Sequence, residues 1–253
     1  MTKALRVANN IPLADDIVQV KPDNAENLER SLAEAIDTML DERNGRKWKQ
    51  SSGFAASMNN ACPRYLGYRL RGFEQDVNFS PQTYRIFDEG HKLEDRLNEY
   101  LENLGILIER ERKIVHAKPP ITAYVDFVVD WDGEKPIECK SISQAGFDYR
   151  KLYKKPSDSH YRQIQVYLDI GQWEEGFVYY ENKNNGEVLP FLVKRDPEFV
   201  GKLYAKWNKI YEAHQNGDLS VRPYKEDSKK CLGCDAFNWC WKKDTTVGIK
   251  MGR

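Results

Sequence analysis

The sequence predicts an α/β protein of the α+β type, in which helices flank a central mixed, largely antiparallel sheet. The first observation is the order of the periodic segments, which runs from helix to three strands, a helix, two strands and a helix. The second is the pair of hairpin signals, Asp132-Gly133 and Asn184-Asn185-Gly186. The third is the long amphipathic segment that starts at Ser80-Pro81 and stops at Gly105. Together they predict a sheet whose sequential strands are paired as hairpins and covered by helices.

The part of the chain before residue 80 is expected to contain an arm and a helical lobe. Residues 1–23 have no clear period and are expected to form an N-terminal arm. Asn24 can cap a helix that runs to about Asn44, because leucine, isoleucine and methionine recur along one face. A short helix is expected to begin at Ala61-Cys62-Pro63-Arg64. We group residues 24–79 as a helical lobe.

Residues 80–220 are expected to form the core, and residues 221–253 a cysteine-rich tail. Ser80 precedes a proline at the first turn of the first core helix, and Gly105 ends that helix. A strand at about 106–115 and the two strands of the Asp132-Gly133 hairpin follow. The remaining elements expected are a loop at 144–157, a helix from 158 to 170, strands at 175–182 and 187–194, and a helix at 197–215.

Composition places the chain among soluble globular proteins. It has 253 residues, 40% of them hydrophobic and 31% charged, and 39 basic residues balance 39 acidic ones. A nucleic-acid partner would therefore be held by a local groove and not by a global positive field. No apolar run approaches about 20 residues, so we expect neither a membrane span nor a signal peptide. A cytoplasmic location with reduced cysteines is expected, and no phosphate-binding loop of a helicase motor is present.

The hairpin from Ala123 to Lys140 carries charge in apolar strands. Asp126 lies in the first strand, and Glu138 and Lys140 lie in the second. Unpaired buried charge is costly, so either a divalent cation between the carboxylates or a surface ion pair must account for them. A three-residue loop, Trp131-Asp132-Gly133 with a left-handed glycine, would place the side chains of the two carboxylates and the lysine on one face of the hairpin. A two-residue loop would put the carboxylates on opposite faces, so the cation hypothesis predicts the longer loop.

Cysteines near the end of the chain form a C-x₂-C-x₅-C pattern. Such spacing in a reducing compartment indicates metal binding and not disulfides. A fourth ligand is needed, for which Cys62 is the candidate and His214 an exposed alternative. Cys139 is excluded, since its place in the strand directs it to the core. The cysteines of the pattern are Cys231, Cys234 and Cys240.

Asp126 and Glu138-Cys139-Lys140 resemble the paired motif of the PD-(D/E)xK nuclease superfamily. Phe87-Asp88-Glu89-Gly90-His91 is similar to the glycine–histidine motif of its RecB-like branch. Gln163 and Tyr167, four residues apart, match the Q-x-x-x-Y helix of that branch. The resemblance implies a restriction-endonuclease-like core and metal-dependent hydrolysis of DNA.

The resemblance also implies residue roles. Asp126, Glu138, His91 and the backbone carbonyl of Cys139 would hold Mg²⁺ or Mn²⁺, for which hard oxygen ligands are suited. The ion would lower the pKa of a bound water and offset charge in the transition state. Lys140 would position that water or stabilise charge. The two remaining residues, Gln163 and Tyr167, would orient Lys140 or the scissile phosphate.

A remote Cys62 followed by three C-terminal cysteines resembles the iron–sulfur nucleases of the RecB-like group. This group includes the AddB-type nucleases and the fourth family of CRISPR-associated proteins. The resemblance spans about residues 55–242 and implies a [4Fe–4S] cluster in a cysteine-rich lobe. Zn²⁺ remains the alternative at four thiolates. Phe237, Trp239 and Trp241 would shield the bound group from solvent.

The segment after the second hairpin strand mixes basic and aromatic side chains, which suits phosphate binding and base stacking. The expected DNA contacts in it are Lys151, Tyr153, Lys154 and Lys155. The sequence is therefore interpreted as that of a DNA exonuclease that acts on single strands or DNA ends, with 5′→3′ polarity favoured. Recombination, repair or CRISPR adaptation, with protein partners, would suit it. The alternative is a non-catalytic zinc- or iron–sulfur-bound nucleic-acid-binding subunit of a larger complex.

Overall fold

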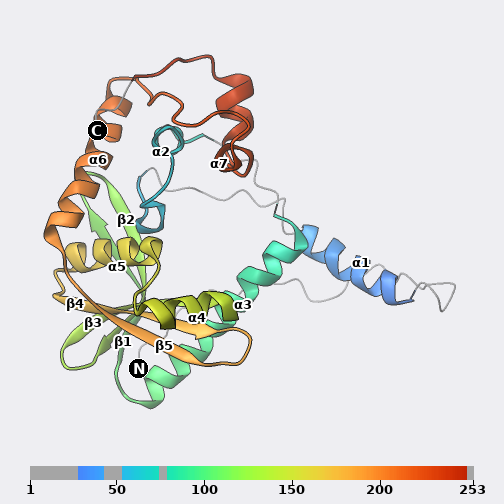
Figure 1. Cartoon of the computed structure of the whole chain (residues 1–253), viewed down its shortest axis with the longest axis vertical. Helices are drawn as coiled ribbons and strands as arrows, with labels where there is room; N and C mark the ends of the chain where they lie inside the picture. The colour runs from blue at the N-terminus through green and yellow to red at the C-terminus, as the bar shows by residue number, and fades with distance from the viewer. Residues whose placement is uncertain (1–27, 43–52, 74–78, 250–253) are drawn as a thin grey trace, which may run out of the picture. The chain divides into compact units, whose positions relative to one another are not determined.

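The chain divides into two compact units, residues 1–44 and residues 45–253. A computed structural model describes residues 28–42, 53–73 and 79–249 (Figure 1). The first unit contains helix α1 (Leu28–Asp41), within the helix expected from Asn24. The expected N-terminal arm and the first turn of that helix lie outside the described residues. The finer division of the second unit stays a prediction.

The second unit is built on a five-stranded mixed sheet flanked by helices. The strands follow one another across the sheet in the order β1-β2-β3-β4-β5. β3 and β4 are parallel, whereas the other three neighbouring pairs are antiparallel. The predicted mixed, largely antiparallel sheet is therefore confirmed. The strands are β1 (Leu107–His116), β2 (Ile121–Asp130), β3 (Glu134–Ile142), β4 (Glu175–Asn182) and β5 (Val188–Lys194).

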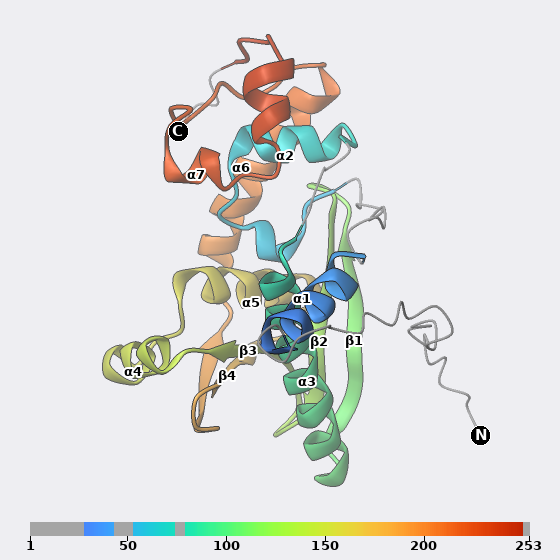
Figure 2. The ribbon, with the colours of Figure 1, turned by 90° about the vertical axis from the view of Figure 1, so that its right-hand side faces the viewer.

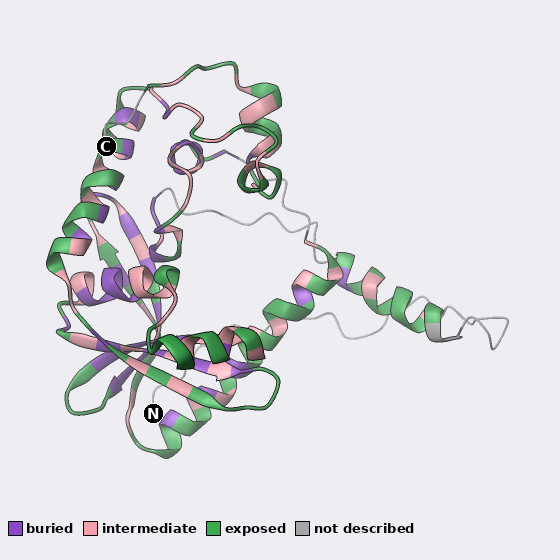
Figure 3. Ribbon diagram, in the orientation of Figure 1, coloured by how far each residue is buried: buried purple, intermediate pink, exposed green. Residues whose placement is uncertain are grey.

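Helices α3 and α5 pack on the sheet through two separate groups of buried residues (Figure 2). α3 buries a leucine stripe against the side chains of Phe127 and Ile137. α5 buries Ile164 and Leu168 in the larger core, and its buried middle is visible in Figure 3. The helices are α2 (Pro63–Leu70), α3 (Pro81–Asn103), α4 (Gln144–Tyr153), α5 (Asp158–Gly171), α6 (Pro197–Gln215) and α7 (Lys229–Leu232), with shorter turns at Ala56–Met58 and Trp239–Lys243.

Helix α4 corrects the loop expected at 144–157. The Ser143 hydroxyl accepts a hydrogen bond from the Gly146 backbone N–H and so begins the helix. Phe147 is its one buried residue, at 2% exposure, and Lys154 ends it in the left-handed conformation. A helix with a single buried residue has no apolar stripe, which is why the periodicity of the sequence did not reveal it.

The turn between β2 and β3 decides which side chains meet. Asp130 pairs with Glu134, so the loop is Trp131-Asp132-Gly133, and Gly133 has φ +91°. The predicted three-residue loop with a left-handed glycine is confirmed. The strands pair as far as Phe127 and Ile137; continued by one residue, this register sets Asp126 opposite Glu138, and the Lys140 ammonium contacts both carboxylates. β3 then continues beside β4.

A buried arginine joins α2 to the C-terminal segment. Arg64, at 1% exposure, donates to Asp244 at 2.9 Å and to the carbonyl of Ser220 at 2.7 Å. Tyr68 donates to the same Asp244 carboxylate at 2.6 Å. These bonds satisfy a guanidinium that would be costly to bury alone. Across residues 28–42, 53–73 and 79–249, no helix is long and apolar enough to cross a membrane.

Candidate active site and cysteine cavity

The candidate site lies where β2 and β3 stop pairing. Beyond Phe127 and Ile137 the backbone N–H of Cys139 has no ladder partner on β2 and bonds instead to the Asp126 carboxylate at 2.7 Å. The Cys139 side chain is 3% exposed and packs in the α3 core, as expected. Asp126 therefore satisfies a buried amide and is fixed by it at the same time.

Glu138 is fully buried and is held by α5. Its Oε2 accepts a hydrogen bond from the Gln163 side-chain nitrogen at 2.8 Å. The second proton of that nitrogen goes to the Tyr167 hydroxyl, also at 2.8 Å, and Tyr167 donates to the Tyr124 carbonyl at 2.9 Å. The predicted helix face is confirmed, but Gln163 contacts Glu138 and not Lys140. The chain of donors fixes Glu138 as an acceptor.

Lys140 neutralises both carboxylates only in part. Its ammonium forms an ion pair with Glu138 and lies 3.8 Å from Asp126. Burial, followed by the negative charge of Asp126, raises the pKa of Glu138 to about 7. Burial also raises the pKa of Asp126, against the opposing effect of Lys140. Two carboxylates thus share one cation in a buried place, which favours further positive charge.

The donor chemistry of this site fits a divalent cation. Carboxylate oxygens from Asp126 and Glu138 are hard ligands at the place where two strands part. In the described part of the chain, however, no three His, Cys, Asp or Glu side chains lie close enough together to hold a metal ion. The exposed His91 on α3 is thus not brought into one group with the carboxylates. Its role as a ligand stays a prediction.

Glu94 is an acidic residue near the site that the sequence reasoning missed. It lies on α3, one turn after His91, and is within 3.9 Å of Arg110 on β1. Burial raises the pKa of Glu94 first, and the negative charge of Asp126 raises it further. The helical spacing from His91 was the available signal, because residues three apart share a face. Glu94 thus extends the acidic site toward α3.

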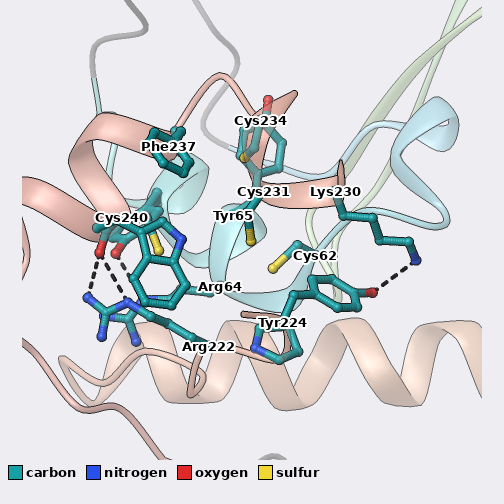
Figure 4. Close-up of a pocket in the computed structure, with 14 residues that line it drawn as sticks. Cys62, Arg64, Tyr65, Arg222, Tyr224, Lys230, Cys231, Cys234, Phe237 and Cys240 are labelled. Atoms are coloured by element: carbon teal, nitrogen blue, oxygen red, sulfur yellow. Dashed lines mark hydrogen bonds between the residues drawn. The ribbon is translucent and has the colours of Figure 1, made fainter. Parts of the chain in front are cut away.

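All four predicted cysteines line one cavity, between the start of α2 and the C-terminal segment. Figure 4 shows their sulfur atoms turned toward the same space. Burial raises the pKa of Cys62, backbone N–H groups oppose it, and the nearby thiolates of Cys240 and Cys231 raise it further. Cys234 behaves in the same way, through burial first and then through Cys62 among its charged neighbours. The four thiols therefore share one cavity, but within the described part of the chain no three of them lie close enough together to hold a metal ion as they stand.

The walls of the cavity suit a thiolate-bound group in their chemistry. Phe237 and Trp241 line it as expected, whereas Trp239 does not line it and is 41% exposed. Arg222 lies in the wall, donates to the Cys240 carbonyl at 3.1 Å and faces the Trp241 ring. His214 is not among the lining residues. Apolar shielding and nearby cations favour a negatively charged metal–thiolate centre.

The residues expected to contact DNA lie at the exposed end of α4 and just after it. Lys151, Tyr153, Lys154 and Lys155 are all exposed, and Lys151 is 3.6 Å from Glu187. Tyr153 packs against Tyr149 with ring centroids 4.4 Å apart. The structure therefore presents them to solvent, which binding requires, and leaves their role as a prediction.

No protein-family model matches the sequence, and a search of curated proteins gives no match. Solved structures do match. An alkaline exonuclease, LHK-Exo from Laribacter hongkongensis, has a TM-score of 0.54 at 14% identity over 66% of this chain and 90% of that one. Its complex with dAMP gives 0.53 at 16% identity over 66% and 89%. SSO0001 gives 0.52 at 18% identity over 85% and 98%. At these identities the likeness is one of fold, and this chain shares its fold with an alkaline exonuclease.

Proposed function

We propose that this chain is a metal-dependent deoxyribonuclease of the PD-(D/E)xK type. The observation that carries the proposal is the meeting of Asp126 and Glu138 where β2 and β3 part, with Lys140 on the same face. The shared fold with an alkaline exonuclease supports it. A pair of buried carboxylates with raised pKa values and a lysine beside them is a common arrangement at hydrolytic sites.

In this proposal Asp126, Glu138 and the Cys139 carbonyl hold Mg²⁺ or Mn²⁺, and His91 adds a ligand. When bound, the ion supplies an activated water and offsets charge on the phosphate. Lys140 remains charged because Glu138 and Asp126 together outweigh the effect of its burial and raise its pKa. It can therefore position the water or stabilise the developing charge.

Gln163 and Tyr167 have a positioning role in the proposal. Gln163 is bonded to Glu138, and Tyr167 is bonded to Gln163 and to the Tyr124 carbonyl. The chain of bonds fixes the rotamer of Glu138, as outer hydrogen bonds do for metal ligands in general. Glu94 on α3 adds negative charge near Asp126 and would strengthen binding of a cation there.

The substrate proposed is single-stranded DNA or DNA ends, with 5′→3′ exonuclease polarity. The neighbouring alkaline exonuclease has been solved with dAMP, a nucleotide, which supports a nucleic-acid substrate. The exposed tyrosine pair and lysines of α4 suit stacking and phosphate contact. Recombination, repair or CRISPR adaptation, with protein partners, is the setting we propose.

For the cysteine cavity we propose a [4Fe–4S] cluster held by four thiolates. The support is that Cys62 and the three C-terminal cysteines line one shielded cavity with Arg222 and Lys230 in its walls. Zn²⁺ is the alternative for the same ligands. The bound group would join α2 to the C-terminal segment, next to the bonds of Arg64.

A second candidate function is a non-catalytic, nucleic-acid-binding subunit of a larger complex. It is favoured by one observation, that no three potential ligands converge among the described residues. The two functions differ in one assay on end-labelled single- and double-stranded DNA, with Mn²⁺ and with chelator. The nuclease proposal expects Mn²⁺-dependent cleavage that is lost in Glu138→Ala and kept in Glu198→Ala, an exposed glutamate on α6. If the wild-type chain and both variants bind DNA but cleave none of it, the result would support the non-catalytic subunit instead.

A further inference from the structure

His160 lies beside Lys140, although no proposed role above uses it. On α5 it precedes Gln163 by one turn and Tyr167 by two, so the three side chains share a helix face. The sheet also places Tyr180 beside Lys140, because Lys140 on β3 is the register partner of Tyr180 on β4. The Tyr180 hydroxyl is 2.7 Å from Nδ1 of His160. Helix and sheet thus both bring the imidazole next to the lysine.

The hydrogen bonds around Tyr180 are the basis on which we assign the tautomer of His160. Tyr180 is 1% exposed, and its hydroxyl oxygen accepts the Ser157 backbone N–H at 3.0 Å. Its own proton needs an acceptor, and the side-chain partners recorded for it are Nδ1 of His160, at 2.7 Å, and Ser157; we assign the proton to Nδ1. Nδ1 therefore accepts, and the ring proton is on Nε2. His160 is held as a neutral donor whose free N–H is on the side away from Tyr180.

Two cations act on this ring, and one of them, Lys140, is already paired with Glu138 and Asp126. Burial, followed by the positive charges of Lys140 and Arg150, lowers the pKa of His160 to about 4. Arg150, on α4, packs over the Tyr149 ring at 4.5 Å. Arg150 is therefore the cation that remains for a ligand, and a neutral N–H donor together with an arginine is a combination that binds a phosphate oxygen.

We propose that His160 and Arg150 form a phosphate-binding position next to Lys140. This position binds the backbone phosphodiester that adjoins the scissile one in the nucleic-acid strand. Nε2–H of His160 donates to a non-bridging oxygen, and Arg150 supplies positive charge. The inference rests on the proposed nuclease function. It names the group of the substrate that α4 and α5 recognise together, and it assigns a binding role that is separate from the carboxylates.

A neutral imidazole of this kind is a poor acid or base near pH 8, so its removal should act on binding. His160→Ala is expected to raise KM for an oligonucleotide about tenfold, with kcat within about twofold, the size of one lost hydrogen bond to a charged group. His160→Gln keeps an N–H donor and should recover most of the affinity. His214→Ala, on α6, is the matched control and should leave both constants unchanged.

Binding can be separated from cleavage in a Glu138→Ala background, using a labelled single-stranded oligonucleotide. Addition of His160→Ala or Arg150→Ala should weaken binding about tenfold, and the difference should shrink as salt is raised. If the wild-type chain cleaves nothing but His160 still contributes to binding, the nuclease proposal fails and the phosphate position stands. If cleavage occurs and KM is unchanged in His160→Ala, the phosphate position is wrong. A fall in kcat alone would also overturn it.

The tautomer has a readout that does not depend on DNA or activity. Nitrogen NMR of histidine-labelled protein should show His160 protonated at Nε2 between about pH 6 and 8. Tyr180→Phe removes the donor to Nδ1 and should give a mixture of both tautomers, with a KM between those of the wild type and His160→Ala. A ring protonated at Nδ1 in the wild type would overturn the assignment.

Discussion

The carboxylate of Asp126 accepts the backbone N–H of Cys139 at 2.7 Å, at the point where β2 and β3 stop pairing. One side chain therefore ends a strand ladder and faces the candidate metal position. The hydrogen bond to Cys139 needs only an acceptor oxygen, whereas binding of a metal ion needs a negative charge. The two tasks can be separated by substitution.

Asp126→Asn keeps an oxygen for the Cys139 N–H, whereas Asp126→Ala leaves that buried amide without an acceptor. We expect Asp126→Ala to lower the free energy of unfolding by about 1–3 kcal/mol relative to Asp126→Asn. Both should lose Mn²⁺-dependent cleavage by about a thousandfold or more. Urea unfolding and the end-labelled DNA assay measure the two effects. Equal stability of the two variants would show that the hydrogen bond is not needed.

Glu138 should make the metal-free protein less stable as pH rises. Its folded-state pKa, about 7, lies above its ordinary value of 4.5, so folding takes up a proton between these values. The stabilising contribution is full below pH 4.5 and is lost as pH rises through 7. In chelator, unfolding between pH 5 and 8 should show this loss, and Mn²⁺ should reverse it at pH 8. In Glu138→Gln the free energy of unfolding should fall less steeply with pH, because the titrating carboxyl is gone. If the pH dependence is unchanged in this variant, Glu138 is not the group responsible.

Gln163→Ala should reduce activity by about 10–100-fold, because Glu138 loses the donor that fixes its orientation. Tyr167→Phe is the comparison variant: it removes a hydroxyl that also interacts with Glu138, but it leaves the 2.8 Å bond from Gln163 to Glu138 in place. Its effect should be smaller. Initial rates across a range of Mn²⁺ concentrations would show both. If Tyr167→Phe were the more damaging change, Gln163 would not be the residue that holds Glu138.

Cys234→Ser should lower the iron content and the visible absorbance of purified protein, and should reduce its solubility. Cys139→Ala is the control, because Cys139 is buried in the α3 core, away from the cavity, and should keep the iron. Metal analysis by mass spectrometry distinguishes the possible outcomes. If the wild-type protein is colourless and contains one equivalent of zinc, the bound group is Zn²⁺ at the same ligands and not an iron–sulfur cluster.

The hairpin was predictable because its information is local. Turn chemistry at Asp132-Gly133 sets the register, and the register sets which carboxylates oppose each other. The bounds of α6 matched the expected Pro197 to Gln215 for a similar reason, since capping residues and an apolar stripe coincide there.

Other features depend on tertiary contacts that no local pattern contains. The partner of Gln163 is Glu138 because α5 crosses the sheet at one particular rotation, which the sequence of α5 alone does not specify. α4 has one buried residue and no stripe, and a serine cap was its only signal. Glu94 did have a signal, one turn after His91, but its proximity to Asp126 depends on how α3 lies against β2.

Arg64 is synthesised long before the residues that form its hydrogen bonds. During synthesis the arginine is added 180 residues before the aspartate that neutralises it, and 156 before the carbonyl of Ser220. On a ribosome that adds about 5–20 residues per second, α2 must wait roughly ten seconds or longer for both partners. Throughout that interval Cys62 also lacks the three other thiols of its cavity. A nascent chain that stalls before Asp244 would therefore expose both a cation and a thiol, which are features that quality-control proteases and chaperones can act on.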